Sequence, residues 1–199
     1  MKQITLIGAF LLLFGLCLST IHAQEMQKPA APTSFASAFR NDCLGVWDDF
    51  TKKMVALAEA MPEEKYSWRP GEGVRSVGEV FTHIASGNYF ILQMAGVKPP
   101  AGIDVKMVDS VKGKAKIIET LKQSCEFARQ SLMNTSDADF GKPAKIFGQD
   151  KTVREAYFLL VTHSPEHLGQ SIAYARMNGV VPPWTAERQA RQQQQQEKK

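Results

Sequence analysis

The sequence is poor in histidine and cysteine and carries no strong excess of either charge. It has four histidines and three cysteines in 199 residues, and its formal net charge is +4. Residues 185–199 hold four basic and two acidic residues, so the rest of the chain is nearly neutral. It therefore lacks the basic footprint of a nucleic-acid-binding protein, and we expect no nucleic-acid partner.

Several catalytic and nucleotide-binding motifs are also missing. The sequence contains no glycine-rich phosphate-binding loop, no dinucleotide-binding glycine fingerprint and no G-x-S-x-G nucleophile motif. Nucleotide-dependent and serine-hydrolase chemistry of these types is therefore not indicated.

One long apolar run is present, at the N-terminus. Residues 4–18 carry no charge, Lys2 precedes them, and the small residue Ala23 follows. This order is typical of a secretory signal peptide cleaved after Ala23, and the run is short for a membrane span of roughly 20 residues. We predict a signal peptide over residues 1–23, a secreted or periplasmic protein and no stable membrane span after cleavage. A retained membrane anchor and a lipoprotein signal at Cys17 are the alternatives.

Composition divides the remaining chain into three parts. Residues 24–33 are rich in Pro and Ala and form a predicted flexible linker, and residues 34–184 form the predicted domain. Residues 185–199 are Gln-rich and charged without an apolar face, and we expect them to be disordered, with a frayed helical extension as the alternative. Cys43 and Cys125 both fall within predicted helices. A disulfide between them and two buried free thiols are both compatible with the sequence.

The domain shows four helical patterns and no convincing strand. Apolar residues recur at spacings of three and four, capping boxes begin the second and fourth patterns, and Pro or Gly follows their ends. The four predicted helices span residues 34–61, 76–96, 112–133 and 152–178. Four helices of this length can enclose one core, so the predicted fold class is an all-α four-helix bundle. The long second and third connections suggest that not all sequence neighbours form simple hairpins.

The three histidines beyond the signal peptide all lie on predicted helices. His163 and His167 are four residues apart, which places both on one helical face. Two imidazoles so placed can chelate one cation, at about 2.0–2.1 Å for zinc. His83 could complete the set if it points into the same cavity, and three ligands with open positions for water are the pattern of a catalytic metal site. The alternative is that these histidines are buried and merely bond backbone carbonyls.

Three polar residues lie near this histidine set. Gln170 shares the face of the histidine pair and could orient a ligand histidine or a bound water. Glu79, one turn before His83, is either the capping-box glutamate or a proton acceptor. Glu166 completes an H-x-x-E-H pattern, the inverzincin peptidase motif in which the glutamate is the general base. Such peptidases take a further acidic ligand from downstream, where the only acidic residues lie in the predicted tail.

Taken in order and spacing, these motifs resemble the DinB-like superfamily of four-helix metalloproteins over the whole of residues 34–184. The matching segments are Trp68-Arg69-Pro70, residues 74–79 leading to His83, residues 152–155 leading to His163-x-x-x-His167-x-Gly169-Gln170, and residues 179–182. The resemblance implies up-up-down-down connectivity and a divalent metal ion, commonly zinc or nickel, held by His83, His163 and His167. It also implies that a homodimer is a frequent state.

Activities in this superfamily include thiol-dependent transfer or isomerisation and apparent hydrolysis. Leu168 stands where many relatives have a basic residue after the last histidine, which argues against an anionic-substrate contact there. Export argues against a cytosolic low-molecular-weight thiol as cofactor. We therefore hypothesise a metal-dependent hydrolase that acts on a small-molecule substrate through a metal-bound water, with Glu166 or Glu79 assisting proton transfer. A metal-dependent thiol S-transferase and a non-enzymatic metal- or ligand-binding protein are the alternatives.

Overall fold

The computed structural model describes residues 34–198. The predicted signal peptide, the linker over residues 24–33 and the lipoprotein alternative at Cys17 lie outside these residues. Within residues 34–198, no helix is both long enough and apolar enough to cross a membrane.

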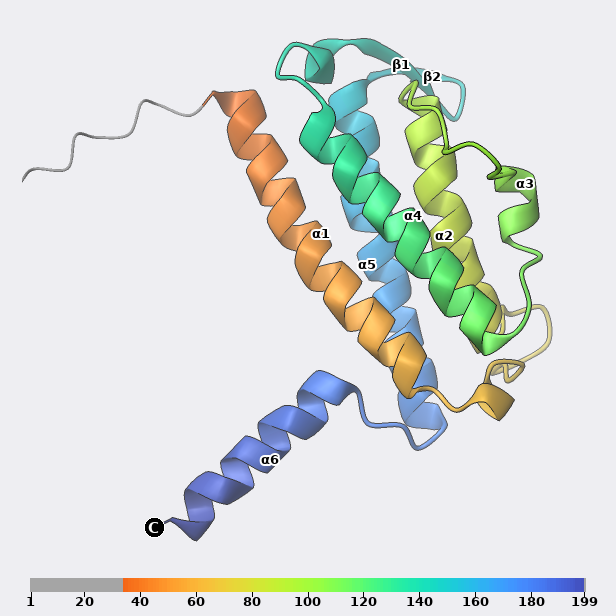
Figure 1. Cartoon of the computed structure of the whole chain (residues 1–199), viewed down its shortest axis with the longest axis vertical. Helices are drawn as coiled ribbons and strands as arrows, with labels where there is room; N and C mark the ends of the chain where they lie inside the picture. The colour runs from red at the N-terminus through yellow and green to blue at the C-terminus, as the bar shows by residue number, and fades with distance from the viewer. Residues whose placement is uncertain (1–33, 199) are drawn as a thin grey trace, which may run out of the picture. The chain divides into compact units, whose positions relative to one another are not determined.

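Four long helices form the bundle and confirm the four predicted helices (Figure 1). They are α1 (Phe35–Ala60), α2 (Val77–Met94), α4 (Lys114–Asn134) and α5 (Val153–Met177). Shorter helical segments lie in the connections: η1 (Glu63–Lys65), α3 (Val105–Val108) and η2 (Asp139–Gly141). Both predicted capping boxes are formed, with Ser76 and Glu79 at the start of α2 and Thr152 and Glu155 at the start of α5. These reciprocal bonds satisfy N–H groups that the first turn of a helix leaves free.

The helices pack in an order that differs from their order in the sequence. Both α1 and α2 pack against α4 and against α5, so α1 and α2 lie diagonally across the bundle. Gly78 at the start of α2 lies against Ile117 at the start of α4, and Asn88 further along α2 bonds Ser124 further along α4, so α2 and α4 run parallel. Thr135 follows the end of α4 and bonds Tyr157 near the start of α5, so these two run antiparallel.

The resulting connectivity is up-down-down-up, and the predicted up-up-down-down order is wrong. The connection between α1 and α2, residues 61–76, stays at one end of the bundle, because the Tyr66 hydroxyl donates to the carbonyl of Ala58 at 2.6 Å and the Tyr66 carbonyl accepts from the N–H of Gly78 at 2.9 Å. It therefore turns the chain back. Residues 95–113 instead link α2 to α4 along the length of the bundle. Extended chain advances about 3.3 Å per residue against 1.5 Å in a helix, so this connection is long enough to return to the end where α2 began.

A two-stranded hairpin also departs from the prediction of no strand. Strands β1 (Pro143–Ile146) and β2 (Gln149–Thr152) pair antiparallel and lead directly into α5. The turn residues Phe147 and Gly148 both have positive φ, 48° and 79°, as a type I′ turn requires. Strands of four residues give too short a pattern for periodicity to detect.

The predicted disordered tail is largely a helix, α6 (Pro183–Glu197). None of its residues is buried, in keeping with its lack of an apolar face. Gln, Ala, Arg and Glu are good helix formers, and Pro183 occupies the first helical position, which proline tolerates. Trp184 in its first turn packs against the core, and intrinsic propensity accounts for the exposed helix that follows.

The core lies between the four long helices and is largely aliphatic and aromatic. Trp47 is buried in it, and its indole N–H donates to the carbonyl of Cys125 at 3.0 Å, joining α1 to α4. Within the described residues Cys43 and Cys125 are both buried free thiols. Burial raises the pKa of Cys43 to about 11 and that of Cys125 to about 12, so neither is an activated thiolate.

Candidate metal centre

The three predicted histidines meet where α2 faces α5. His83 comes from α2, and His163 and His167 come from successive turns of α5. The ring centroid of His83 lies 5.3 Å from that of His163 and 4.7 Å from that of His167. One nitrogen of each ring lies within 4.8 Å of the others, and all three side chains are only partly buried. The structure thus brings together the three residues that the sequence singled out.

The spacing of the ring nitrogens fits a single divalent cation. The Nε2 atoms of His163 and His167 are 3.3 Å apart, and two nitrogens bound at about 2.0–2.1 Å to one tetrahedral ion lie about 3.3–3.4 Å apart. Nδ1 of His163 is buried and has no hydrogen-bond partner among residues 34–198. His163 is therefore not a core histidine that merely bonds a backbone carbonyl, which was the alternative that the sequence left open. Three imidazoles suit zinc, nickel, copper or iron.

The surroundings favour the neutral forms of His83 and His163. The pKa of His83 is lowered to about 4, chiefly by burial and then by the positive charges of Arg75, His167 and His163. Burial also lowers the pKa of His163, again with contributions from His167 and Arg75, while the charge of Glu166 acts in the opposite direction. A neutral imidazole has a free lone pair, which is the form that binds a metal ion.

Gln170 holds one histidine in place through a chain of contacts. Its amide oxygen lies 2.9 Å from Nδ1 of His167, and its amide nitrogen donates to the hydroxyl of Tyr174, also at 2.9 Å. The Tyr174 ring in turn packs edge-on against Trp68, 5.5 Å between centroids. With the amide oxygen facing the ring, Nδ1 of His167 carries the proton and the Nε2 lone pair faces the other histidines. Gln170 thus lies where the sequence placed it.

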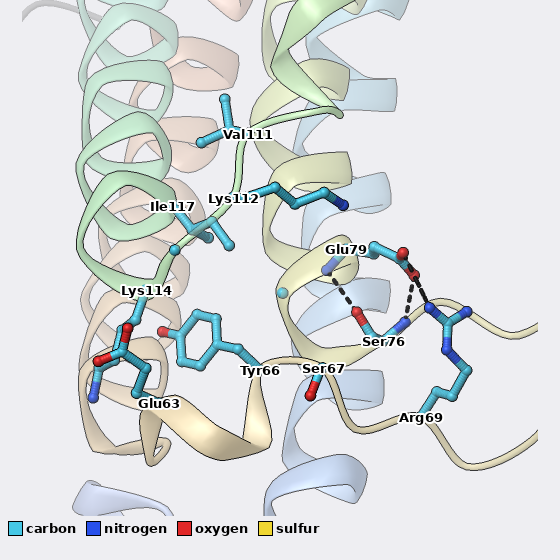
Figure 2. A pocket seen from close by; sticks show the side chains of 12 residues that line it. Glu63, Tyr66, Ser67, Arg69, Ser76, Glu79, Val111, Lys112, Lys114 and Ile117 are labelled. Carbon is cyan, nitrogen blue, oxygen red and sulfur yellow. Dashed lines mark hydrogen bonds and ion pairs between the residues drawn. The ribbon is translucent and has the colours of Figure 1, made fainter.

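Glu79 serves the cap of α2 rather than His83 (Figure 2). Its carboxylate accepts from the backbone N–H of Ser76 at 2.8 Å and from Arg69 at 3.1 Å. The Ser76 bond, and then Arg69, hold its pKa below the usual value. The pocket that Glu79 lines, about 400 Å³ between the starts of α2 and α4, includes none of the three histidines. The capping role that the sequence offered is the one formed.

Glu166 lies beside the histidines but does not join them. It is exposed on α5, and its charge is close enough to act on the pKa of His163. Among the described residues, no acidic side chain is grouped with His83, His163 and His167. The acidic third ligand of an inverzincin peptidase therefore has no counterpart in the described part of the chain.

One residue that the sequence reasoning missed is Gly87. It lies four residues after His83 on α2, and a Cβ added there would be 2.8 Å from Cε1 of His163. Real Cβ atoms essentially never come that close to another heavy atom, so the ring of His163 occupies space that only glycine leaves free. A glycine one helical turn from a candidate ligand was the available signal.

A second missed feature is a buried polar network next to the centre. The amide of Asn88 donates to the hydroxyl of Ser124 at 3.1 Å and accepts from that of Ser164 at 3.1 Å. All three side chains are fully or almost fully buried and they join α2, α4 and α5. Because Ser164 directly follows His163, this network fixes the spacing of α2 and α5 at the histidines.

Three solved structures share this fold. A DinB-like protein from Bacillus cereus has a TM-score of 0.56 and 20% identity, covering 72% of this chain and 95% of its own. The DinB-like protein YjoA from Bacillus subtilis has a TM-score of 0.57 and 18% identity, covering 71% and 94%. YfiT from Bacillus subtilis, described as a probable metal-dependent hydrolase with an unusual four-helix bundle topology, has a TM-score of 0.57 and 17% identity, covering 77% and 94%.

The sequence gives a family assignment of its own. No functionally curated protein matches it. The sequence profile of the DinB superfamily matches residues 47–171, which include the whole of α2, α4 and the three histidines. The fold, the histidine cluster and this match agree, and the chain belongs to the DinB superfamily.

Proposed function

We propose that this protein is an exported, divalent-metal-dependent hydrolase of a small-molecule substrate. The observation that carries the proposal is the set of three convergent histidines, His83, His163 and His167. Three protein nitrogens leave positions for water and substrate, as in catalytic rather than structural metal sites. The description of the structural relative YfiT as a probable metal-dependent hydrolase supports the choice of reaction. Zinc or nickel is the ion that we propose.

Each residue near the centre has a proposed role. The three histidines would hold the ion, and a divalent cation supplies a Lewis acid that lowers the pKa of the water it binds. Gln170 fixes the ring of His167. We propose Glu166 as the proton acceptor, because its charge reaches His163 whereas the carboxylate of Glu79 is held in the helix cap.

The test begins with metal content and continues with a substrate screen. Purified protein, loaded with zinc or nickel, should hold about one equivalent by mass spectrometry, and His163→Ala should hold none. A panel of chromogenic esters, amides and phosphoesters should then show metal-dependent hydrolysis. Thiol-dependent transfer without hydrolysis would favour the S-transferase, and bound metal without any turnover would favour a binding protein. Failure to bind any divalent ion would refute the proposal.

Export is proposed from the sequence of residues 1–23. N-terminal sequencing of protein recovered from the periplasm or medium should begin at Gln24. Protein that stays in the cytoplasm with an intact N-terminus would contradict export and reopen the case for a cytosolic thiol cofactor.

A further inference from the structure

Three exposed phenylalanines gather at the hairpin end of α2 and α5. Phe90, Phe147 and Phe158 expose 46%, 67% and 59% of their surfaces. The rings of Phe90 and Phe147 are 6.1 Å apart between centroids, and Phe147 and Phe158 line one pocket of about 360 Å³. Contiguous exposed apolar side chains mark interaction or ligand-binding sites, whereas single exposed ones are ordinary.

The backbone at Phe147 is strained in a way that its packing does not explain. Its φ of 48° lies in the left-handed region, where Asn and Gly are favoured in a type I′ turn. A phenylalanine there is costly, and two thirds of its surface is exposed. An unfavourable residue at an exposed turn points to a use of its side chain other than stability.

This aromatic surface lies in line with the histidine centre. Phe90 is seven residues after His83 on α2, so the two share one helical face about 10 Å apart along the axis. Gly87, which carries no side chain, lies between them on that face. On α5, Leu159 is one turn before His163 and lines the same pocket as Phe147. Figure 1 shows the hairpin where α2 ends and α5 begins.

The charges around the pocket select for an uncharged group. Lys151 and Glu155 both line it, and they pair with each other at 3.3 Å. Their charges therefore offset one another, and the remaining lining is mainly apolar, with Ile146, Leu159 and the two phenylalanines.

We propose that Phe90, Phe147 and Phe158 bind an uncharged aryl group of the substrate whose reacting group lies at the three histidines. This inference rests on the proposed function and names a class of substrate for it. The reacting group and the aryl group are separated by two helical turns, about 10 Å. Offset or edge-on contacts with the exposed rings supply the recognition.

The test uses hydroxamates, which bind divalent metal ions without being turned over. Isothermal titration of the zinc-loaded protein compares acetohydroxamate with phenyl-terminated hydroxamates of increasing methylene spacer. We expect the phenyl group to add about tenfold in affinity or more once the spacer spans about 10 Å, and little before that. Phe147→Asn and Phe158→Ala should each remove most of this gain and leave acetohydroxamate binding unchanged.

A stability measurement separates recognition from folding. Phe147→Asn should melt at the same temperature as wild type or higher, because Asn suits the left-handed turn. The control is Phe35→Asn, which alters an equally exposed ring on α1 and should leave every hydroxamate affinity unchanged.

The outcomes are distinct. If acetohydroxamate does not bind, the proposed metal-dependent function is refuted, and the aryl site, which rests on that function, is refuted as well. If it binds but the phenyl spacer adds nothing, or Phe147→Asn binds like wild type, only the aryl site is overturned. If Phe147→Asn instead dissociates a dimer in sedimentation and leaves the affinities unchanged, the surface is an interface between two copies of the chain, which also overturns the aryl site.

Discussion

Gly87→Ala provides a direct test of the geometry at the histidine centre. The new Cβ would lie 2.8 Å from Cε1 of His163, whereas ordinary contacts begin near 3.4 Å. The ring must therefore move by about 0.6 Å, or the two helices must separate. Metal–ligand distances tolerate only about 0.2 Å, so a displacement of this size should disturb the ion even if the fold survives.

Two effects on stability oppose each other in this variant. Replacing Gly by Ala inside a helix stabilises it by about 0.5–1 kcal/mol, and overpacking costs about 1–3 kcal/mol. The net change for Gly87→Ala is therefore between near zero and about 2.5 kcal/mol of destabilisation. Gly45→Ala is the matched control, since its Cβ would meet no other part of the described chain within 4 Å. Gly45→Ala should therefore show only the stabilisation of about 0.5–1 kcal/mol that alanine brings to a helix.

The assay measures zinc affinity by competition with a chromophoric chelator, and urea unfolding with EDTA present. We expect Gly87→Ala to lose about 10–100-fold in zinc affinity, the range found when groups that orient metal ligands are changed. Gly45→Ala should keep wild-type affinity and unfold at higher urea. Equal zinc affinity in wild type and Gly87→Ala would refute the close packing of Gly87 on His163 as a determinant of the site.

Three further predictions follow from neighbouring contacts. Asn88→Ala should destabilise the protein by about 2–4 kcal/mol in urea unfolding, because it removes the acceptor of the buried Ser164 hydroxyl and leaves a small cavity. A change under about 0.5 kcal/mol would contradict the buried network. Gln170→Leu should weaken zinc binding about tenfold, because the ring of His167 loses the amide that orients it. Zinc titration measures the affinity, and the urea midpoint should change little. Unchanged affinity would show that the amide does not orient the ring. In metal-free protein, the free energy of unfolding should fall as the pH drops from about 6.5 to about 4. His83 has a pKa lowered to about 4 in the folded state, so over this range the unfolded state takes up a proton that the folded state does not. His83→Leu should flatten this pH dependence, and an equally steep curve in the variant would assign the dependence to another group.

The local features of the fold could be read from the sequence. Helical periodicity and the capping boxes at Ser76 and Thr152 depend on neighbouring residues, and the structure forms them as expected. The pairing of His163 with His167 is also local, because a spacing of four fixes both on one face of α5. Helix propensity likewise explains α6, although we expected disorder because that segment has no core to join.

Other features depended on which helices meet in space. Nothing in the sequence near His83 specifies that α2 packs beside α5, and the direction of each helix follows from the path of its connection. The spacing of Gly87 from His83 was visible in the sequence, but its contact with the ring of His163 appears only in the folded chain. The unfavourable position of Phe147 likewise appears only when its turn conformation is known. Short-range spacing therefore determined the helices and two of the three candidate ligands, His163 and His167. Packing between α2 and α5, which lie some 80 residues apart in the sequence, added His83 to this pair. Contacts between such distant segments leave no periodic pattern in the sequence, so only the tertiary structure shows them.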